Sequence, residues 1–374
     1  MRKIPINLLQ PGMRVGQVLY NSLGQLLINK GTLLTEKLIA RLRMAGIPSI
    51  YVENDFLSNV EIVDVITGEV REKAKRQVRE LLHETSVSGC GCAIIRLADI
   101  TRTVEQIIDQ LFGNPGLMVN LVDIRAIDDY TFGHSVNVCV LSLLTGITMG
   151  YDRAELLALG IGALLHDIGK AKIPDQILTK PGKLTQEEFE IIREHPVFGY
   201  KMLLNMPGVS TDSAHIAHEH HERYQGQGYP RGIKKKEIHD FAVICGIADV
   251  FDALTSDRVY RKAYPIHEAY ELLSGSGNFL FDYQIVEAFL QNIAAYPLGT
   301  TVRLSSGQIG VVAETKRGLS IYPRVRVFLD SNGSGIEPYD IELWENRDIV
   351  VAEVLDEKEL KATIAREVES GFVE

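Results

Sequence analysis

The sequence has no run of about eighteen uncharged apolar residues, the length that a helix needs to cross a bilayer. Its apolar stretches near Val136–Met149 and Leu156–Leu165 are short, and Ser, Thr or Gly interrupts them. The first residues also lack the continuous apolar core and the small-residue cleavage site of a secretory signal. We therefore expect a cytoplasmic protein with no membrane span.

Cysteine is scarce, with 4 residues in a chain of 374. Cys90 and Cys92 are separated by one glycine, whereas Cys139 and Cys245 are isolated in apolar surroundings, as is common for buried thiols. A chain of this size and composition does not need a disulfide framework. No second Cys or His pair lies near Cys90 and Cys92, so we expect no metal or redox site there.

Basic residues are fewer than acidic ones: the sequence has 39 Lys and Arg residues and 49 Asp and Glu residues, which gives a net charge of -10. A protein that binds DNA or RNA polymers needs a basic surface that displaces counterions. The acidic balance argues against that class. It remains compatible with a small anionic molecule held by a local basic cluster.

The character of the sequence changes along the chain. Residues 1–66 mix short β-type runs with one helical stretch, Thr35–Met44, and predict a small α+β module. Residues 67–116 are charged and helical, which predicts a helical linker. Residues 117–295 alternate apolar helical periods with polar breaks and contain nine of the ten histidines. We expect a mainly α multidomain protein whose functional core is this third region.

Residues 296–374 read differently from the rest. Glycine, serine, asparagine and proline separate short alternating runs, which predict a small antiparallel sheet or β barrel followed by a charged tail. The runs are Thr301–Leu304, Gln308–Ala313, Leu319–Ile321, Arg324–Leu329 and Asp340–Trp344.

His166 and Asp167 stand side by side at the end of an apolar helical stretch. Neighbours on a helix point about 100° apart, so this pair suits two different ions. A His-Asp pair alone also fits an ordinary helix terminus. Further histidines and acidic residues at intervals along the same region favour a metal site.

These residues lie within motifs that occur in a fixed order: Leu164–Lys170, Ile173–Asp175, His195–Pro196, His220–Arg223, Gln227–Gly232 and Ala248–Thr255. Together they resemble the HD-GYP domain, the branch of the His-Asp phosphohydrolases that cleaves cyclic di-GMP. The resemblance covers roughly residues 117–295, and Gly228-Tyr229-Pro230 is the trait that separates this branch from other His-Asp phosphohydrolases. It implies an α-helical catalytic domain that hydrolyses cyclic di-GMP to pGpG, with further cleavage to GMP left open.

The resemblance places metal ligands at seven positions, which are His134, His166, Asp167, His195, His220, His221 and Asp249. Imidazole and carboxylate ligands without thiolate favour iron or manganese over a closed structural zinc site. We therefore expect a dinuclear iron or manganese centre that Asp167 bridges. Some family members hold a third metal through a glutamate four residues before the first histidine, but Tyr130 stands there. Asp128 and Asp129 remain alternative ligands.

A pair of neighbouring ions makes hydroxide available from water at neutral pH and neutralises charge on phosphoryl oxygens. Asp167 is therefore an expected catalytic residue, and so is Lys170, which matches a lysine that contacts phosphate in the family. Substrate contacts are expected from Lys170, Tyr229, Arg258 and Arg261. The two arginines are three residues apart, so on a helix they share a face that suits the two phosphates of a cyclic dinucleotide. A solvated surface is the alternative for each basic residue.

Two other functions stay open. One is a non-catalytic receptor or scaffold that binds a cyclic dinucleotide or a protein without hydrolysis. The other is hydrolysis of a different cyclic dinucleotide, because nothing in the sequence distinguishes guanine from adenine recognition. A homodimer or a signalling-protein partner is also left open.

Overall fold

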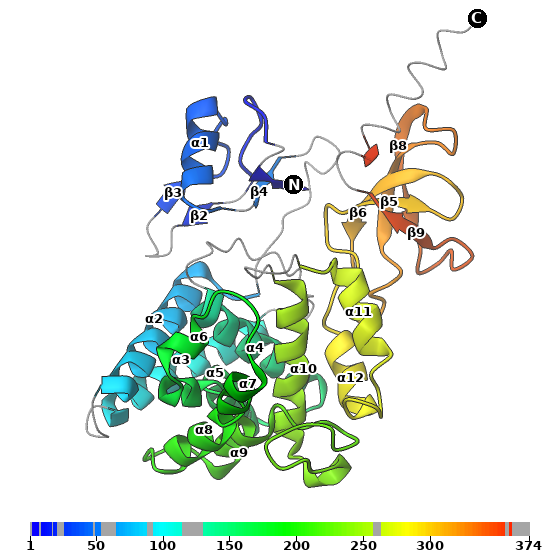
Figure 1. Cartoon of the computed structure of the whole chain (residues 1–374). Helices are drawn as coiled ribbons and strands as arrows, with labels where there is room; N and C mark the ends of the chain where they lie inside the picture. Colours follow the sequence, from blue (N-terminus) through cyan, green and yellow to red (C-terminus); the bar gives the residue numbers. More distant parts are fainter. Residues whose placement is uncertain are drawn as a thin grey trace, which may run out of the picture. The chain divides into compact units, whose positions relative to one another are not determined.

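The computed structural model describes residues 2–6, 9–16, 18–20, 26–47, 49–53, 65–87, 93–113, 130–256, 263–355 and 359–360 (Figure 1). The chain divides into two compact units. One is helical and comprises residues 65–115 and 130–292, while the other comprises residues 1–64, 116–129 and 293–374. The predicted domain boundaries at residues 66, 116 and 295 stay predictions.

Helix α4 (Tyr130–Thr148) is the central helix of the helical unit. It packs against α2 (Gly68–Val87), α5 (Arg153–Leu164), α10 (Asp240–Thr255) and α12 (Tyr283–Leu290). Such contacts on several sides require a helix that is apolar almost all round. The buried apolar side chains of α4 meet this need: Val136, Val138, Cys139, Val140, Leu141, Leu143 and Leu144.

A second group of helices lies beside α5 and α10. Helix α8 (His195–Leu204) packs against α9 (Thr211–Glu219) and against the short 3-10 helix η4 (Ile168–Lys172), and α9 also packs against α5 and α10. Figure 1 shows α8 and α9 in green next to α10. The unit is completed by α3 (Ala93–Gly113), α6 (Asp175–Leu178), α7 (Gln186–Ile192), η5 (Lys235–Glu237) and α11 (Ile266–Ser274).

Side-chain caps fix where several of these helices begin. The Asp152 carboxylate accepts hydrogen bonds from the first turn of α5, and Glu155 bonds back to the Asp152 backbone N–H. Ser210 caps α9 in the same way, through the N–H of the third helical residue. Nδ1 of His239 accepts from the N–H of Phe241 and caps α10. Each cap satisfies backbone donors that otherwise lack a partner.

Gly169 permits the contact between η4 and the start of α8. A Cβ atom on this residue would lie 1.9 Å from the carbonyl oxygen of His195. Only glycine therefore allows the two backbones to approach this closely. The approach places Asp167, immediately before η4, beside the first side chain of α8.

The N-terminal part has two short antiparallel pairs and one helix. Strand β1 (Arg2–Pro5) pairs with β4 (Ser49–Val52), and β2 (Leu19–Tyr20) pairs with β3 (Leu26–Ile28). Helix α1 (Glu36–Met44) begins after Thr35, whose hydroxyl accepts from the N–H of Leu38. Its core contains Ile4, Val15, Leu19, Leu34, Ile39, Leu42, Ile50 and Val52. The prediction of an α+β module is confirmed.

The C-terminal part is one antiparallel sheet of five strands in the order β8-β7-β6-β5-β9. Its strands are β5 (Thr301–Leu304), β6 (Ile309–Glu314), β7 (Arg324–Leu329), β8 (Gly335–Glu342) and β9 (Val351–Val354). The predicted β module is confirmed. The strand prediction for Leu319–Ile321 is wrong, because this segment forms a turn in which the Tyr322 N–H donates to the Leu319 carbonyl.

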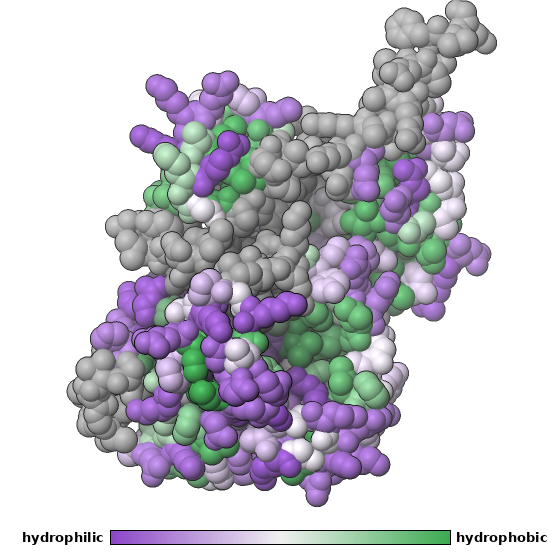
Figure 2. All heavy atoms as spheres, viewed as in Figure 1, coloured by the Kyte–Doolittle hydropathy of each residue, from purple (hydrophilic) through white to green (hydrophobic). Residues whose placement is uncertain are grey.

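In the described part of the chain, none of the helices combines the length and the apolar character that a membrane span requires. Hydrophilic side chains cover most of the visible face of the helical unit in Figure 2, with a hydrophobic area near α11. The apolar helix α4 is therefore covered by helices whose outer faces are polar.

Candidate metal centre

The seven predicted metal-binding residues come from five parts of the helical unit. His134 lies on α4, His166 and Asp167 link α5 to η4, His195 opens α8, His220 and His221 follow α9, and Asp249 lies on α10. Five of them are almost completely enclosed: His134, His166, Asp167, His195 and His220. The fold thus brings together side chains that are far apart in the sequence.

The potential ligand atoms form two groups. In one, atoms of Asp167, His195, His220 and His221 all lie within 4.8 Å of one another. In the other, atoms of His134, His166 and Asp167 satisfy the same limit. The Asp167 carboxylate belongs to both groups.

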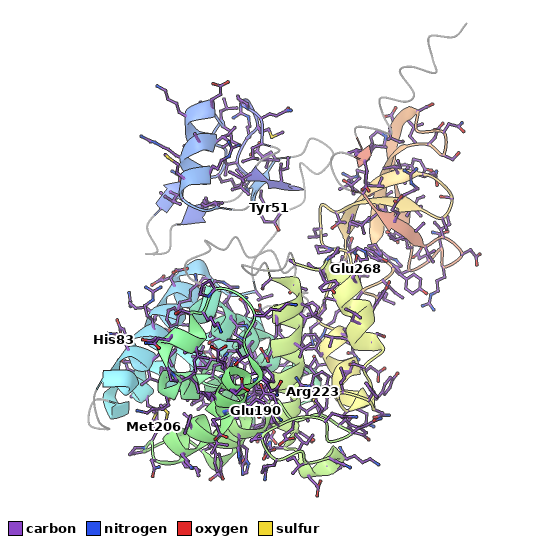
Figure 3. The ribbon with its side chains drawn as sticks, in the orientation of Figure 1. Tyr51, His83, Glu190, Met206, Arg223 and Glu268 are labelled. Atoms are coloured by element: carbon purple, nitrogen blue, oxygen red, sulfur yellow. The ribbon has the colours of Figure 1, made fainter. Side chains whose placement is uncertain are left out.

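Asp249 lies beside both groups. Its Oδ1 is 3.2 Å from Nε2 of His134, and its Oδ2 is 4.0 Å from Nδ1 of His221. All seven predicted residues therefore lie in one cluster. Figure 3 shows the side chains of the helical unit as sticks, with Glu190 and Arg223 among the labelled residues.

Backbone carbonyl groups orient three of the imidazoles. Nδ1 of His166, His195 and His220 lies 2.8, 2.7 and 3.0 Å from carbonyl oxygens three or four residues earlier. A carbonyl oxygen only accepts hydrogen bonds, so each Nδ1 carries the proton. Each Nε2 consequently offers a lone pair, and Nε2 of His166 and of His195 both lie 3.3 Å from the Asp167 carboxylate.

Two buried atoms in the cluster make no hydrogen bond with the described residues, namely Nε2 of His166 and Oδ1 of Asp167. A buried polar atom without a partner costs free energy. A cation would satisfy both atoms at once, because each offers a lone pair. The cluster therefore fits a metal centre.

The charges of the cluster favour the same interpretation. Burial alone would raise the pKa of Asp167, but Lys170 and the adjacent imidazoles hold it well below its usual value. Burial and neighbouring histidines keep the pKa of His220 well below its usual value, and burial is the main cause that lowers the pKa of His221 to about 3. An ionised Asp167 beside neutral imidazoles of His220 and His221 is the protonation state that binds metal.

The pKa of His134 is shifted in the opposite direction from those of His220 and His221. Burial lowers its pKa, but the carboxylates of Asp249 and Asp252 outweigh this effect and raise the value to about 9. Its Nδ1 lies 2.7 Å from Oδ2 of Asp252, and Oδ1 of Asp252 accepts a hydrogen bond of 2.8 Å from Asn137. No role for Asp252 or Asn137 was predicted from the sequence. Asp252 lies three residues after Asp249, so on a helix it shares a face with this predicted ligand, and this spacing could have indicated a role at the site.

Lys170 and Tyr229 lie at the cluster, and their role as substrate contacts stays a prediction. Nζ of Lys170 donates to Oδ2 of Asp167 at 2.5 Å. The Tyr229 ring stacks on His221 with a centroid distance of 4.6 Å, and the Arg193 guanidinium lies 4.9 Å from the centroid of the Tyr229 ring. Arg193 is a basic group at the site that the sequence analysis did not select.

The loop that carries Tyr229 is fixed by a buried carboxylate. Oε1 of Glu222 accepts from the backbone N–H groups of Arg231 and Gly232 at 2.7 and 3.1 Å. A Cβ atom on Gly228 would lie 2.4 Å from the His221 carbonyl oxygen, so glycine is required there. The peptide bond between Tyr229 and Pro230 is cis.

Several predictions fall outside the described residues. These concern Arg258 and Arg261, the side chain of Tyr130, the alternative ligands Asp128 and Asp129, and the Cys90–Cys92 pair. Cys139 and Cys245 are buried free thiols, as predicted.

Comparison with known proteins identifies two regions. A family model described as an HD domain matches residues 125–285, and one described as a KOW domain associated with HD domain matches residues 301–363. The first region carries the histidine and aspartate cluster, and the second contains the five-stranded sheet.

The chain is 38% identical over 237 residues to the cyclic di-GMP phosphodiesterase PA4108 of Pseudomonas aeruginosa, covering 63% of this chain and 57% of that protein. It is 35% identical over 168 residues to the 3'3'-cGAMP-specific phosphodiesterase 3 of Vibrio cholerae, covering 45% of this chain and 36% of that protein. The chain thus spans about half the length of the curated relatives it matches. The solved structure of Bd1817, an HDG"Y"P protein from Bdellovibrio bacteriovorus, aligns with a TM-score of 0.47 at 17% identity, over 77% of this chain and 97% of that one.

The helical unit thus carries an HD domain, and its buried cluster of histidine and aspartate side chains fits a metal centre. Residues 125–285 therefore match the HD domain, and residues 301–363 match the KOW domain associated with it. The chain's resemblance to HD-GYP domain proteins is confirmed.

Proposed function

We propose that this chain is a metal-dependent phosphodiesterase that hydrolyses cyclic di-GMP to pGpG. The observation that carries the proposal is the single cluster of seven side chains in which Asp167 belongs to both groups of ligand atoms. The name of the relative with 38% identity supports the substrate class. A nucleotide substrate of this class implies that the protein acts in the cytoplasm.

The metal centre is proposed to be dinuclear, with iron or manganese. Asp167, His195, His220 and His221 would hold one ion, and His134, His166 and Asp167 the other, with Asp249 completing the set. The donors are nitrogen and oxygen atoms without thiolate, which suits these metals. When bound, such a pair supplies activated water and neutralises charge on the phosphoryl oxygens.

The protein's own residues would orient the substrate. The Lys170 ammonium lies against Asp167, so it can donate to a phosphoryl oxygen at the cluster without leaving its helix turn. The Tyr229 ring lies against the His221 ring and the Arg193 guanidinium, so Tyr229 would contact the substrate through its hydroxyl, which can donate to a phosphoryl oxygen. Arg258 and Arg261 remain proposed contacts to the second phosphate.

Product analysis tests this function. The purified protein is loaded anaerobically with Fe(II) or Mn(II) and mixed with cyclic di-GMP, and its products are resolved by chromatography. We expect the linear dinucleotide pGpG from the wild type and none from His166→Ala. Binding of cyclic di-GMP without linear product in the metal-loaded wild type would refute hydrolysis and favour a receptor.

A second candidate is hydrolysis of a mixed GMP–AMP ring. The relative with 35% identity, which is named as specific for 3'3'-cGAMP, is the observation that favours it. The same assay with both dinucleotides decides between the candidates, because the preferred substrate gives the higher kcat/KM.

A further inference from the structure

Asp252 is a buried carboxylate beside the metal centre that belongs to neither group of ligand atoms. One oxygen, Oδ2, lies 2.7 Å from Nδ1 of His134, and the other, Oδ1, accepts from Nδ2 of Asn137 at 2.8 Å. A carboxylate that accepts a hydrogen bond from Nδ1–H directs Nε2 of the imidazole towards the metal. The position of Asp252 therefore fixes which nitrogen of His134 faces Asp249.

Asn137 extends this arrangement away from the centre. Its side chain is buried on α4, one turn after His134, and its Oδ1 accepts a hydrogen bond of 2.8 Å from Nη1 of Arg71. A guanidinium only donates and a carboxylate only accepts. The amide of Asn137 consequently has a single orientation that satisfies both neighbours.

Arg71 lies in the first turn of α2, the helix with which the helical unit begins in the sequence. Helix α2 packs against α4 and against η4, which follows Asp167. The hydrogen bonds thus join three helices, with Arg71 on α2, His134 and Asn137 on α4 and Asp252 on α10. All four residues belong to the same compact unit.

We propose that Arg71, Asn137 and Asp252 form a chain of positioning residues that holds His134 in its metal-binding orientation and links the first turn of α2 to the metal centre. The inference rests on the proposed function in one respect, because it takes His134 as a metal ligand. A shift of Arg71 would be transmitted through Asn137 to the carboxylate that orients His134. Regulation of metal affinity through α2 follows from this connection.

Metal affinity, measured by chelator competition with Mn(II), tests this chain of positioning residues. Partners that orient a ligating histidine typically contribute about 10–100-fold to metal affinity, so we expect a loss of that size for Asp252→Asn. Asn137→Leu and Arg71→Met should give successively smaller losses. Arg71→Lys, which keeps a donor, should recover part of the affinity lost in Arg71→Met. The matched control is Arg102→Met, since Arg102 is an exposed residue on α3 that pairs with Asp99.

A second measurement separates positioning from general damage to the fold. Long-range 1H–15N spectra of the histidine rings report the protonation and hydrogen bonding of each ring nitrogen of His134, in metal-free protein and with Zn(II) as a diamagnetic probe. We expect the His134 signals to shift in Asp252→Asn, Asn137→Leu and Arg71→Met, while those of His267, a partly buried residue on α11, stay unchanged.

The outcomes are distinguishable. Unchanged His134 signals and Mn(II) affinity in Arg71→Met, relative to Arg102→Met, would refute the link to α2. If the wild type bound Mn(II) but hydrolysed no cyclic dinucleotide, the proposed function would fail. The Mn(II) affinities and the His134 spectra would still test the chain of positioning residues. If Asn137→Leu does not fold, the comparison of Arg71→Met with Arg71→Lys decides.

Discussion

Replacing Gly169 with alanine should separate Asp167 from His195. The new Cβ would start 1.9 Å from the His195 carbonyl oxygen, whereas real Cβ atoms essentially never approach closer than 3.0 Å, so the two segments must part by at least 1.1 Å. The obstacle is backbone, which cannot rotate away like a flexible side chain. Overpacking of this kind costs about 1–3 kcal/mol of stability.

The displacement acts directly on the metal centre. Oδ1 of Asp167 lies 3.3 Å from Nε2 of His195, close enough for both atoms to bind one ion. A displacement of at least 1.1 Å would move the two atoms apart and weaken their binding of that ion. A misplacement of about 1 Å can cost roughly 100-fold in rate. We therefore expect Gly169→Ala to lose most of its turnover and to bind Mn(II) more weakly.

Urea unfolding followed by circular dichroism, together with Mn(II) titration, measures both effects. Gly275→Ala is the control, because the nearest atoms to its new Cβ lie 3.7 and 3.8 Å away and its φ of -75° suits alanine. We expect the control to change stability by less than about 0.5 kcal/mol. Wild-type stability and Mn(II) affinity in Gly169→Ala would refute the reasoning.

Three further predictions follow from the site. Asp167→Ala should lose bound metal and turnover while circular dichroism stays unchanged, and full activity would contradict its shared role. Arg258→Ala should raise KM for the dinucleotide without changing the metal content, and an unchanged KM would place this arginine in solvent. In metal-free protein, the raised pKa of His134 stabilises the fold fully below about pH 6.5, and this contribution is lost as the pH rises through about 9. The free energy of unfolding should therefore fall by up to about 3 kcal/mol more in the wild type than in His134→Gln over that range, and parallel curves would contradict the assignment.

Much of the site was predictable because several of its potential metal ligands are adjacent in short sequence motifs. His166 and Asp167 are adjacent, and His220 and His221 are adjacent, so each pair of side chains is recognised locally. The strands Thr301–Leu304 and Arg324–Leu329 were also predicted with their observed bounds, since apolar and polar residues alternate along them.

The remaining features depend on contacts that no local pattern records. Asp252 meets His134 across 118 positions of the sequence, and Arg71 meets Asn137 across 66. Strand β8 begins at Gly335, earlier than the predicted Asp340, because its first residues are mostly exposed and only their pairing with β7 defines the strand. The need for glycine at position 169 likewise appears only when η4 meets α8.

The sharing of Asp167 between the two groups has a consequence for how the centre fills. In the proposed dinuclear centre, a cation bound by either group would fix the Asp167 carboxylate in the orientation that the other group also uses, which would favour binding of the second cation. Metal binding would then be cooperative, and little protein with a single bound ion would be present at intermediate metal concentrations. By the same reciprocity, loss of His195 from one group would weaken metal binding by His134 in the other.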